Sequence, residues 1–398
     1  MTIAEIAETI TVDFASEDGP VFMATKCYFN LQDVLVRCSS LVSESKGEYY
    51  CLNPAFQPLL TIMTGTIKLS HFSVKEYLLS GHIAKYFSIS EKAAHMKISE
   101  ISVAYLLQFD SFNPLTVAML NSSPLAEYAA KYWVDHAKSG GIDAAPLKLI
   151  SQLFTSESAA LTNWVRIYDT DPSVWQNHQN LSMDKSKVYS PLYYASLAGL
   201  QQVSEHLLEK GADVNAQGGY YGNALQAASF KGHEAIVRLL LEKEADVNAQ
   251  RGEYHNALHA ASSNGHEAIV KLLLEKGADV NAQGGEYDNA LYMASLGSYE
   301  AIVKLLEWGA IGKLLEKKAD VNPMAEKYGS ALYMASLGKY EAIVKLLLEN
   351  EADVNAQGGQ YGYALQAASL TGHEAIVKLL LEKGADVNAQ GGVYGSAL

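Results

Sequence analysis

The second half of the chain repeats one pattern of apolar and polar positions. Its clearest marker is a leucine that follows an alanine or a proline, and this leucine stands at positions 192, 225, 258, 291, 332, 365 and 398. Successive leucines lie 33 residues apart, except for one step of 41 between Leu291 and Leu332. Self-similarity at a fixed period is typical of arrays in which neighbouring units stack on one another.

Each unit predicts two helices joined by a tight turn. In one unit, Ala227 and Ala228 are followed by a Gly232-His233 break and then by residues 235–241, whose apolar positions recur at helical spacing. Glycine pairs such as Gly218-Gly219 lead into the next unit, where a turn needs positive φ angles. Because one helix pair leaves apolar faces open, the pattern predicts that consecutive pairs stack.

The long step predicts an insertion of eight residues. The surplus lies within residues 305–318, where the string KLLE at 304–307 is repeated at 313–316. We expect it either to lengthen the second helix of its unit or to add a loop after that helix.

These features resemble ankyrin repeats. Ser190 to Tyr193 is close to the TPLH box, a Gly-His pair precedes the second helix, and the string GADVNA follows it. The resemblance covers about 187–398 and implies a concave protein-binding surface without catalysis. This sequence departs from the pattern in two places. The TPLH proline is alanine after the first unit, and the glycine after the second helix is Glu244, Lys318 or Glu351 in three units.

The pattern contains about six units and the beginning of a seventh. The seventh begins at Gly391 and stops at Leu398, whereas arrays normally end in a polar capping repeat. We therefore expect a fragment or truncated product in which the apolar side of the sixth unit is uncovered, with self-association through that side as one outcome.

Residues 1–88 predict a winged-helix-like module. Residues 33–42 are expected to form a helix running into a short strand, 67–74 a second strand, and 74–79 a further helix. Residues 48–65 interrupt the link between the two strand segments, either as a wing or as an artefact of the gene prediction.

Residues 89–186 predict a helical linker. Ser123 and Pro124 have the order of an N-cap and a first helical residue, and Ser139-Gly140-Gly141 is a stop signal. One face of this predicted helix carries Leu125, Tyr128, Ala129, Tyr132, Trp133 and His136.

Four strings before the repeats carry a second resemblance. DVLVRCSSLV at 33–42, IKLSHFSVKEYLLS at 67–80, SPLAEYAAKYWVDHA at 123–137 and TNWVRIYD at 162–169 are similar, in this order, to the region after the NACHT domain of fungal NOD-like (STAND) proteins. That resemblance implies an upstream P-loop ATPase, a relay in this region and ligand sensing by the repeats. The motif GxxxxGK[ST] does not occur in the sequence, so we expect no ATP or GTP binding by this chain.

Charge and cysteine content narrow the class of protein. Of 398 residues, 30 are basic and 44 acidic, which gives a net charge of −14 and disfavours nucleic acid and anionic membrane surfaces as partners. No apolar segment has the length of a membrane span, and the N-terminus lacks a signal-peptide pattern. Cys27, Cys38 and Cys51 have neither disulfide nor zinc spacing. A cytoplasmic protein is expected.

Motifs that imitate chemical sites are incomplete. Asp213-x-Asn215-x-Gln217 resembles the start of a calcium loop, but its twelfth position is Ala224 where a glutamate is required. Gly218-Gly219-x-x-Gly222 lacks a preceding strand, and Ser70-His71 lacks a nucleophile elbow. His255 and His259 are four residues apart without a third metal ligand. We expect no catalytic residue, cofactor or metal, and thus no enzyme.

Two further sets of residues recur with the period. His233, His266 and His373 stand at the break between helices, where Tyr299 and Tyr340 replace them, which favours packing and hydrogen bonding over ligation. A tyrosine ladder recurs before each first helix and is expected to pack between repeats, with a recognition stripe as the alternative. Its members are Tyr221, Tyr254, Tyr287, Tyr328, Tyr361 and Tyr394.

Variable positions in an otherwise uniform repeat are the candidate protein-binding residues. They cluster at the turn before the tyrosine and at the end of the first helix, two places that line the concave groove in ankyrin proteins; the alternative is that they vary because they are exposed. They are Tyr220, Glu253, Glu286, Lys327 and Gln360 at the turns, and Phe230, Lys231, Ser263, Asn264, Leu296, Leu337, Leu370 and Thr371 at the helix ends.

The sequence thus predicts a mainly α protein: an ankyrin-repeat solenoid preceded by a winged-helix-like module and a helical region. The expected function is non-catalytic binding of a protein ligand, as the sensor and relay part of a fungal NOD-like receptor. A free-standing ankyrin adaptor and a fragment of a P-loop nucleoside-triphosphatase switch are the alternatives.

Overall fold

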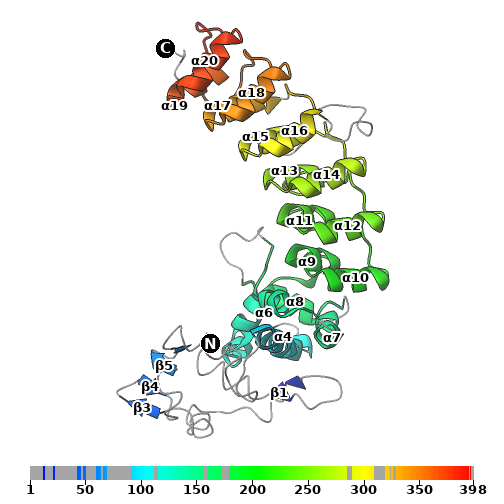
Figure 1. Ribbon diagram of the computed structural model, residues 1–398. Coiled ribbons are helices and arrows are strands. Elements are labelled where there is room, and N and C mark those ends of the chain that lie inside the picture. The colour runs from blue at the N-terminus through cyan, green and yellow to red at the C-terminus, as the bar shows by residue number, and fades with distance from the viewer. Residues whose placement is uncertain are drawn as a thin grey trace, which may run out of the picture. The chain divides into compact units, whose positions relative to one another are not determined.

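The computed structural model describes residues 91–398, apart from 112–114, 143, 156–158, 172–178, 285–288, 309–318, 323, 326–328, 394 and 396–398. Before residue 91 it describes six short strands. The chain divides into two compact units, Met1–Pro191 and Leu192–Leu398. Figure 1 shows the helices and strands of each unit.

Short antiparallel strands form the described part of the N-terminal segment. β1 (Val12–Asp13) pairs with β2 (Val21–Phe22). A four-stranded sheet has the order β3-β4-β5-β6, formed by Ser43–Ser45, Glu48–Tyr50, Leu60–Met63 and Thr66–Leu69. The interrupting segment 48–65 thus contains two of these strands, and β6 overlaps the predicted strand at 67–74. The helix and short strand expected within 33–42, the helix expected at 74–79, the three cysteines and Ser70-His71 lie outside the described residues.

A helical bundle completes the first unit. Its elements are α4 (Glu91–Leu107), a 3-10 turn (Gln108–Ser111), α5 (Val117–Asn121), α6 (Ala126–Gly140), α7 (Ala144–Leu153), α8 (Ala159–Ile167) and a 3-10 turn (Lys185–Lys187). Three large buried rings meet at its centre: Trp133 lies 5.4 Å from Trp164 and 6.2 Å from Phe154, edge to face. The Trp164 ring nitrogen donates to the Ala130 carbonyl at 2.9 Å. Helix α6 is thereby fixed to α7 and α8.

The start of α6 differs from the prediction. The helix begins at Ala126 after Leu125, and no side chain caps it. Ser123 contributes its carbonyl instead, which accepts from the Ala126 N–H at 3.0 Å, so Ser123 and Pro124 belong to the turn before the helix. The apolar face predicted for this helix is also partly wrong, because Tyr132 is exposed. The residues of α6 and its N-cap that lie in the core include Leu125, Ala129, Ala130, Trp133 and Ala137.

Six helix pairs form the second unit, which confirms the predicted solenoid. The first helices are α9 (Pro191–Ala198), α11 (Ala224–Lys231), α13 (Ala257–Ser263), α15 (Ala290–Leu296), α17 (Ala331–Leu337) and α19 (Ala364–Thr371). The second helices are α10 (Gln201–Glu209), α12 (Glu234–Glu242), α14 (Glu267–Glu275), α16 (Glu300–Trp308), α18 (Glu341–Glu349) and α20 (Glu374–Glu382). A small hairpin of β7 (Met324–Ala325) and β8 (Gly329–Ser330) precedes α17.

Polar N-caps replace the missing proline at the start of the first helices. The Asn223 side-chain oxygen accepts from the Gln226 N–H at 2.9 Å, and Asn256 does the same for the His259 N–H at 2.8 Å. Ser330 caps α17 through its hydroxyl. A side-chain acceptor at the N-cap stabilises a helix by about 1 kcal/mol, so these helices begin at a defined residue without proline.

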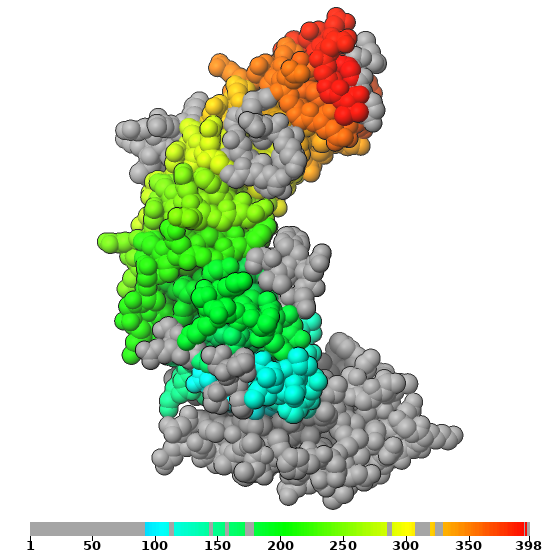
Figure 2. Space-filling model, turned by 180° about the vertical axis from the view of Figure 1, so that it is seen from behind, coloured from blue at the N-terminus to red at the C-terminus, as the bar shows by residue number. Residues whose placement is uncertain are grey.

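The apolar core runs through the whole array. Leu240 and Leu273 on the second helices are fully buried, as the helical spacing predicts, and pack with the leucines of the repeated motif. Each pair also covers its predecessor, because Leu274 is 4% exposed while its counterpart Leu381 in the last pair is 41% exposed. Figure 2 shows the described repeats as one continuous packed body.

The eight-residue surplus leaves the register of the stack unchanged. Helix α16 is described from Glu300 to Trp308, nine residues like α14. The Ala319 N–H donates to the Leu306 carbonyl at 3.2 Å, the same closing bond that Ala245 makes to Leu240 at 3.0 Å without the surplus. Residues 309–318 lie outside the described part.

Candidate protein-interaction surface

The array has two faces of different chemistry. The first helices lie along its concave side and the second helices along its convex side (Figure 1). We call the turns that lead into the first helices the fingers; in the first of them, Gln217 bridges Asn223. The fingers and the ends of the first helices together form the first-helix face.

Four aromatic rings gather on the first-helix face. The Phe230 ring centre lies 4.6 Å from both the Tyr221 and the Tyr254 ring centres, while these two tyrosines stack at 6.1 Å with 16° between their planes. Tyr220 meets Tyr221 edge-on at 5.2 Å. The Lys231 ammonium lies 5.7 Å from the Phe230 ring centre. We call Tyr220, Tyr221, Phe230 and Tyr254 the aromatic cluster.

The other predicted binding residues follow along the same face. Ser263 and Asn264 are half-buried and small, and the Asn264 amide donates to the Ser263 hydroxyl at 3.1 Å. Leu296 is 37% exposed and Leu370 49%, so each adds apolar surface to this face. Leu337 and Thr371 are half-buried, and Glu253 and Gln360 are exposed at finger tips. Glu286 and Lys327 lie outside the described residues.

A polar side chain at the position after the repeated leucine ties the next finger down in several units. The Gln226 amide nitrogen donates to three carbonyls of the next finger, those of Ala249, Arg251 and His255, at 3.1, 3.0 and 2.9 Å. Gln366 contacts its own next finger in the same way. Tyr193 accepts from the Tyr221 N–H at 3.4 Å. The fingers are therefore held in fixed positions on the stack.

His259, on α13 in the third helix pair, makes this contact in its unit. Its Nε2 lies 3.0 Å from the Ala282 carbonyl oxygen, and burial lowers the pKa of the imidazole to about 4. The neutral ring is therefore the form present in the fold near neutral pH. The His255 ring lies 6.0 Å away, and its charge would lower the pKa of His259 further. The two histidines thus pack together while Nε2 of His259 is engaged with backbone.

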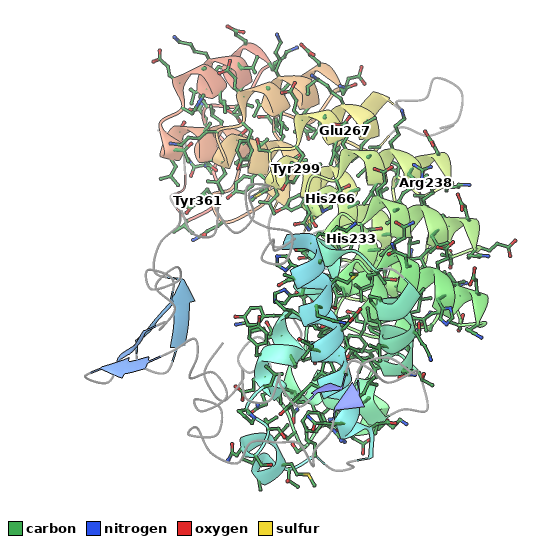
Figure 3. All side chains as sticks on the ribbon, turned by 60° about the horizontal axis from the view of Figure 1, so that its bottom comes forward. His233, Arg238, His266, Glu267, Tyr299 and Tyr361 are labelled. Atoms are coloured by element: carbon green, nitrogen blue, oxygen red, sulfur yellow. The ribbon has the colours of Figure 1, made fainter. Side chains whose placement is uncertain are left out.

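The histidine or tyrosine at the break between the two helices of a unit packs against the preceding unit. Nε2 of His266 lies 2.9 Å from the carbonyl oxygen of Phe230, which is near the end of the preceding first helix. A Cβ at Gly232 would lie 2.5 Å from the His266 ring, so glycine is required there for the ring to fit. Figure 3 shows His233, His266 and Tyr299 in a row along the array, while Arg238 projects from the other face.

An asparagine ladder joins the loops that follow the second helices. The Asn215 side-chain oxygen accepts from the Asp246 N–H at 2.8 Å, and Asn248 accepts from Asp279 N–H at 2.8 Å. The bond from Asp320 N–H to Asn281 is 2.7 Å long and spans the surplus. Asp213 also accepts from the Asn215 N–H at 2.9 Å. The acid and the amide that imitate a calcium loop therefore serve the turn and the junction.

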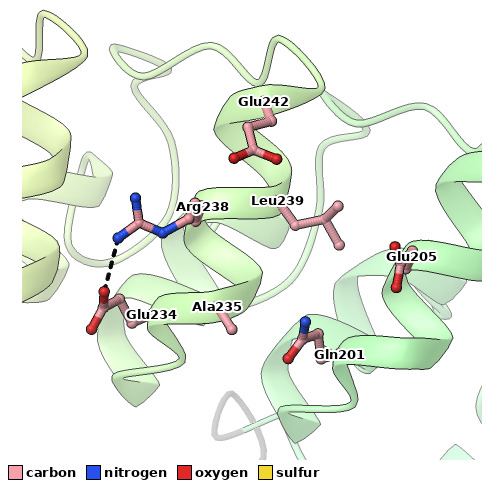
Figure 4. Close-up of a pocket in the computed structure, with 7 residues that line it drawn as sticks. All are labelled: Gln201, Glu205, Glu234, Ala235, Arg238, Leu239 and Glu242. Atoms are coloured by element: carbon pink, nitrogen blue, oxygen red, sulfur yellow. Dashed lines mark hydrogen bonds and ion pairs between the residues drawn. The ribbon is translucent and has the colours of Figure 1, made fainter.

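The second-helix face is polar and pairs its charges internally. Arg238 bonds Glu234 at 3.0 Å and Lys378 bonds Glu374 at 2.6 Å, and similar pairs join Lys304 to Glu300 and Lys345 to Glu349. A shallow groove of about 530 Å³ lies between α10 and α12. As Figure 4 shows, its lining is mostly charged: Gln201, Glu205, Glu234, Ala235, Arg238, Leu239 and Glu242.

Within the described residues, no group of three or more histidine, cysteine or acidic side chains is placed to hold a metal ion. No helix in that part of the chain is long and apolar enough to cross a membrane.

The tyrosine ladder packs between repeats where it is described. Tyr221 is buried and stacks on Tyr254, as expected of a packing role, and the Tyr361 N–H donates to the Tyr333 hydroxyl at 3.2 Å. Tyr287, Tyr328 and Tyr394 lie outside the described residues. Sequence reasoning missed the finger-tying position and the asparagine ladder. The recurrence of asparagine in every DVN string was the available signal for the ladder.

Comparison with known proteins agrees with this architecture. The profile of the family described as ankyrin repeats (three copies) matches residues 171–251, 225–312 and 307–391, which together are more than half of the chain. The azaphilone pigments biosynthesis cluster protein L of Monascus ruber is 36% identical over 244 residues, 57% of this chain and 49% of that protein. The chain thus spans about half the length of this curated relative.

Solved ankyrin structures also match at low similarity. The human ASB11 ankyrin repeat domain gives a TM-score of 0.44 at 25% identity, over 52% of this chain and 90% of that chain. The ankyrin repeat domain of Bcl-3, of the IkappaB family, gives 0.43 at 24% identity, over 52% and 92%. The repeated motif, the six helix pairs and the family profile lead to one conclusion: the chain belongs to the ankyrin-repeat family.

Proposed function

We propose that this protein binds a protein partner across the first-helix face of its repeat array and carries out no catalysis. Ankyrin repeats indicate a role in protein–protein interaction. The observation that carries the choice of face is the exposure of Leu296 and Leu370 there, on the same face as the partly exposed aromatic cluster. Apolar anchors within a polar surround are how binding hot spots are usually built.

The second-helix face is the weaker candidate. Its cations Arg238, Lys304, Lys345 and Lys378 already pair with glutamates one helical turn away, and exposed ion pairs of this kind contribute little free energy. The groove between α10 and α12 is lined by three carboxylates, those of Glu205, Glu234 and Glu242, beside Arg238 and three uncharged side chains. Fixed fingers support the first-helix face, because a preorganised surface loses less entropy on binding.

The finer role that we propose is that of sensor and relay in a fungal NOD-like receptor. It is supported by the order of the four strings between residues 33 and 169 and by a relative in a fungus. The name of that relative assigns it to a pigment biosynthesis cluster, and 51% of its length lies outside the match, so its role is not transferred here. Reading the gene upstream of Met1 for an in-frame GxxxxGK[ST] motif separates a receptor or NTPase fragment from a free-standing adaptor.

Surface plasmon resonance on a partner first obtained by cross-linking to the full chain tests the proposed face. Leu296→Ala and Leu370→Ala should each weaken binding by more than about 1 kcal/mol if these leucines are anchors. Charge reversal at Glu253 should mainly change the association rate and its salt dependence. The matched controls are Arg238→Glu and Lys271→Glu on the second-helix face. Loss of binding confined to these controls would place the site on the opposite face.

A further inference from the structure

Two histidines meet where α4 packs on α6 in the helical bundle of the first unit. Nδ1 of His95, on α4, lies 2.7 Å from Nδ1 of His136, on α6, and the two ring centres are 4.9 Å apart. Both side chains are half-buried. The two residues are 41 positions apart in the sequence, so their contact depends on the packing of the two helices. We call them the histidine pair.

The distance between the two facing nitrogens requires that they share one hydrogen. A hydrogen bond needs an N–H donor and a lone pair, so only one of the two Nδ1 atoms can carry hydrogen while the rings stay together. The Tyr128 hydroxyl lies 2.9 Å from Nε2 of His136 and engages the other nitrogen of that ring. The contact therefore accommodates two neutral rings, or one neutral and one charged ring, and excludes two charged rings.

The backbones of the two helices approach closely beside the histidine pair. A Cβ at Gly140, the last residue of α6, would overlap the backbone of Met96 and would lie 3.0 Å from the carbonyl carbon of His95. Glycine at this position thus lets α4 lie directly on α6. Closely packed segments transmit strain, so two rings that repel each other at this crossing act on the helices themselves.

Protonation of the second ring is opposed by its surroundings. Burial lowers the pKa of His136, and the charge of a protonated His95 lowers it further, while Asp135 raises it to a smaller extent. An unfolded histidine titrates near about pH 6.5. Because the pKa of the folded ring is lower, the unfolded chain binds more protons below about pH 6.5. The contact therefore keeps its full stability above that pH and loses stability as the pH falls below it.

The ionisable groups on the elements that pack against the histidine pair are mostly cationic or engaged elsewhere. Glu100 pairs with Lys97 on α4, and Asp110 in the 3-10 turn accepts a backbone N–H. Glu127 on α6 accepts from an amide side chain, and Arg166 on α8 donates to a backbone carbonyl. The others are Asp13 in β1, Glu91 and Lys92 in α4, Lys131, Asp135 and Lys138 in α6, and Lys148 in α7.

We propose that the histidine pair is an acid-sensitive latch between α4 and α6, which stays closed while at most one ring is protonated and opens when both are. Opening separates the start of α4 from the end of α6. Histidine is the side chain whose charge ordinarily changes in this pH range, and the contact between the two helices is the two-state element that the charge controls. This switch is independent of partner binding by the repeats.

Hydrogen–deuterium exchange of the full chain at about pH 7 and about pH 5 tests the latch. Each rate is expressed as a protection factor, because the exchange of an unprotected amide itself depends on pH. We expect the protection factors of residues 92–100 and 132–140 to fall about tenfold or more at the lower pH. The reason is that a contact requiring a neutral ring opens about tenfold more often per pH unit below about 6.5. The internal reference is α8, which contains no histidine and should keep its protection.

His136→Gln removes the second charge and keeps a side chain that can donate and accept hydrogen bonds. In this variant α4 should stay protected at about pH 5, and His95→Gln should have the same effect. The matched control is His259→Gln, which removes a buried histidine of the repeat array and should leave the exchange of α4 as it is in the unaltered chain. Circular dichroism near pH 7 checks that each variant is folded.

A titration of the unaltered chain keeps the proposal testable if both glutamine variants fail to fold. NMR of the chain labelled with ¹³C in its histidine rings should show one ring of the pair titrating well below the other. The pair is identified by the nuclear Overhauser effect between its two rings.

Four results would overturn the inference. If α4 keeps its protection at about pH 5, the rings separate without moving the helices. If α8 loses protection as much as α4, the bundle unfolds as one body and contains no latch. If the loss persists in both glutamine variants, other groups cause it. If both rings titrate together near about pH 6.5, they do not share a hydrogen.

Discussion

At His259 a titratable ring makes the finger contact that amides make at Gln226 and Gln366. The pKa of the buried ring is lowered to about 4, whereas an unfolded histidine titrates near about 6.5. Between these values the unfolded chain binds more protons than the folded chain, so stability falls as the pH falls through this window. Above about pH 6.5 the ring is neutral in both states and the penalty is absent.

This difference predicts a pH-dependent loss of stability that glutamine abolishes. Lowering the pH from about 7 to about 5 should cost about 2 kcal/mol through His259 alone. His259→Gln copies the Gln226 contact and should remove that part of the pH dependence while keeping stability near pH 7. Urea unfolding followed at both pH values measures it. Equal pH dependence in the two proteins would mean that the ring is not buried in its neutral form.

Two glutamates occupy backbone conformations that favour glycine. Glu244 has φ 63° and Glu351 has φ 66°, at the turn where Gly211 and Gly277 have φ 85° and 86°. Side chains with a Cβ are strained in this region. Glu244→Gly and Glu351→Gly should each stabilise the array by about 0.5 to 1 kcal/mol.

The reverse change is the control for this strain. A Cβ at Gly277 meets no atom within 4 Å, so Gly277→Ala tests the backbone term without a clash and should destabilise the array. Thermal melts of the three single variants give the sign of each change. A Glu244→Gly protein with a lower melting temperature than its parent would show that the backbone of Glu244 is not strained.

The sequence predicts whether a single residue is buried, but it does not predict which residues contact one another. The spacing predicts buried Leu240 and Leu273, because helical periodicity alone decides which side of a helix is apolar. It does not predict that Tyr221 and Tyr254 enclose Phe230, since that contact joins residues from consecutive units whose approach depends on the stack. The contacts that the described candidate residues make with one another were therefore not foreseen.

At the level of helix pairs, the break between helices has two interchangeable forms. In one form the left-handed residue is glycine and a histidine follows, as at Gly265-His266. In the other the left-handed residue is Ser298 or Lys339, the glycine stands one position earlier, and a tyrosine follows. A Cβ at Gly297 would lie 2.2 Å from the Tyr299 ring, which explains why the glycine moves together with the tyrosine.

This coupling predicts that one change destabilises the unit and three changes together do not. Gly297→Asn should lose about 1 to 3 kcal/mol, because the Tyr299 ring must leave its place. Adding Ser298→Gly and Tyr299→His reproduces the Asn264-Gly265-His266 form and should recover that loss. Urea unfolding of the single and triple variants measures both. Equal destabilisation in the two would show that the break is not a self-contained element.

The residue at which a helix begins was the hardest feature of the helices to predict from the sequence. Ser123 and Pro124 have the cap signature, yet α6 begins at Ala126 because the Ser123 carbonyl closes a turn with the Ala126 N–H. In the repeats, six copies of one pattern report the same boundary, and the segment expected at 235–241 lies within α12 (Glu234–Glu242). A single helix offers no such averaging, and local capping signals locate its start only within a residue or two.

For the molecule as a whole, the surplus after α16 shows how the array absorbs a change in length. The closing bond from Ala319 to Leu306 and the ladder bond from Asp320 to Asn281 are both formed across it. Deleting residues 307–314 leaves Leu306 followed by Leu315-Glu316-Lys317-Lys318-Ala319, which reproduces the order after Leu240.

We expect this deletion to change the free energy of unfolding by less than about 1 kcal/mol, because loop-closure entropy depends weakly on length. Denaturant unfolding of the full chain measures it. Deleting eight residues from 267–274 is the contrasting control, because it removes most of α14 and should unfold its neighbours. A large loss of stability in the first deletion would mean that the surplus carries contacts of its own.

The near-identity of the second helices also has a consequence for how such a gene changes. α14, α18 and α20 share the sequence EAIVKLLLE, and the asparagine ladder joins consecutive loops by the same bond. Unequal recombination that adds or removes one whole unit therefore recreates intact junctions on both sides. Such an exchange moves Leu370 one repeat nearer to or farther from Phe230 while leaving each local site unaltered. The distance between recognition points on a partner can then evolve separately from the points themselves.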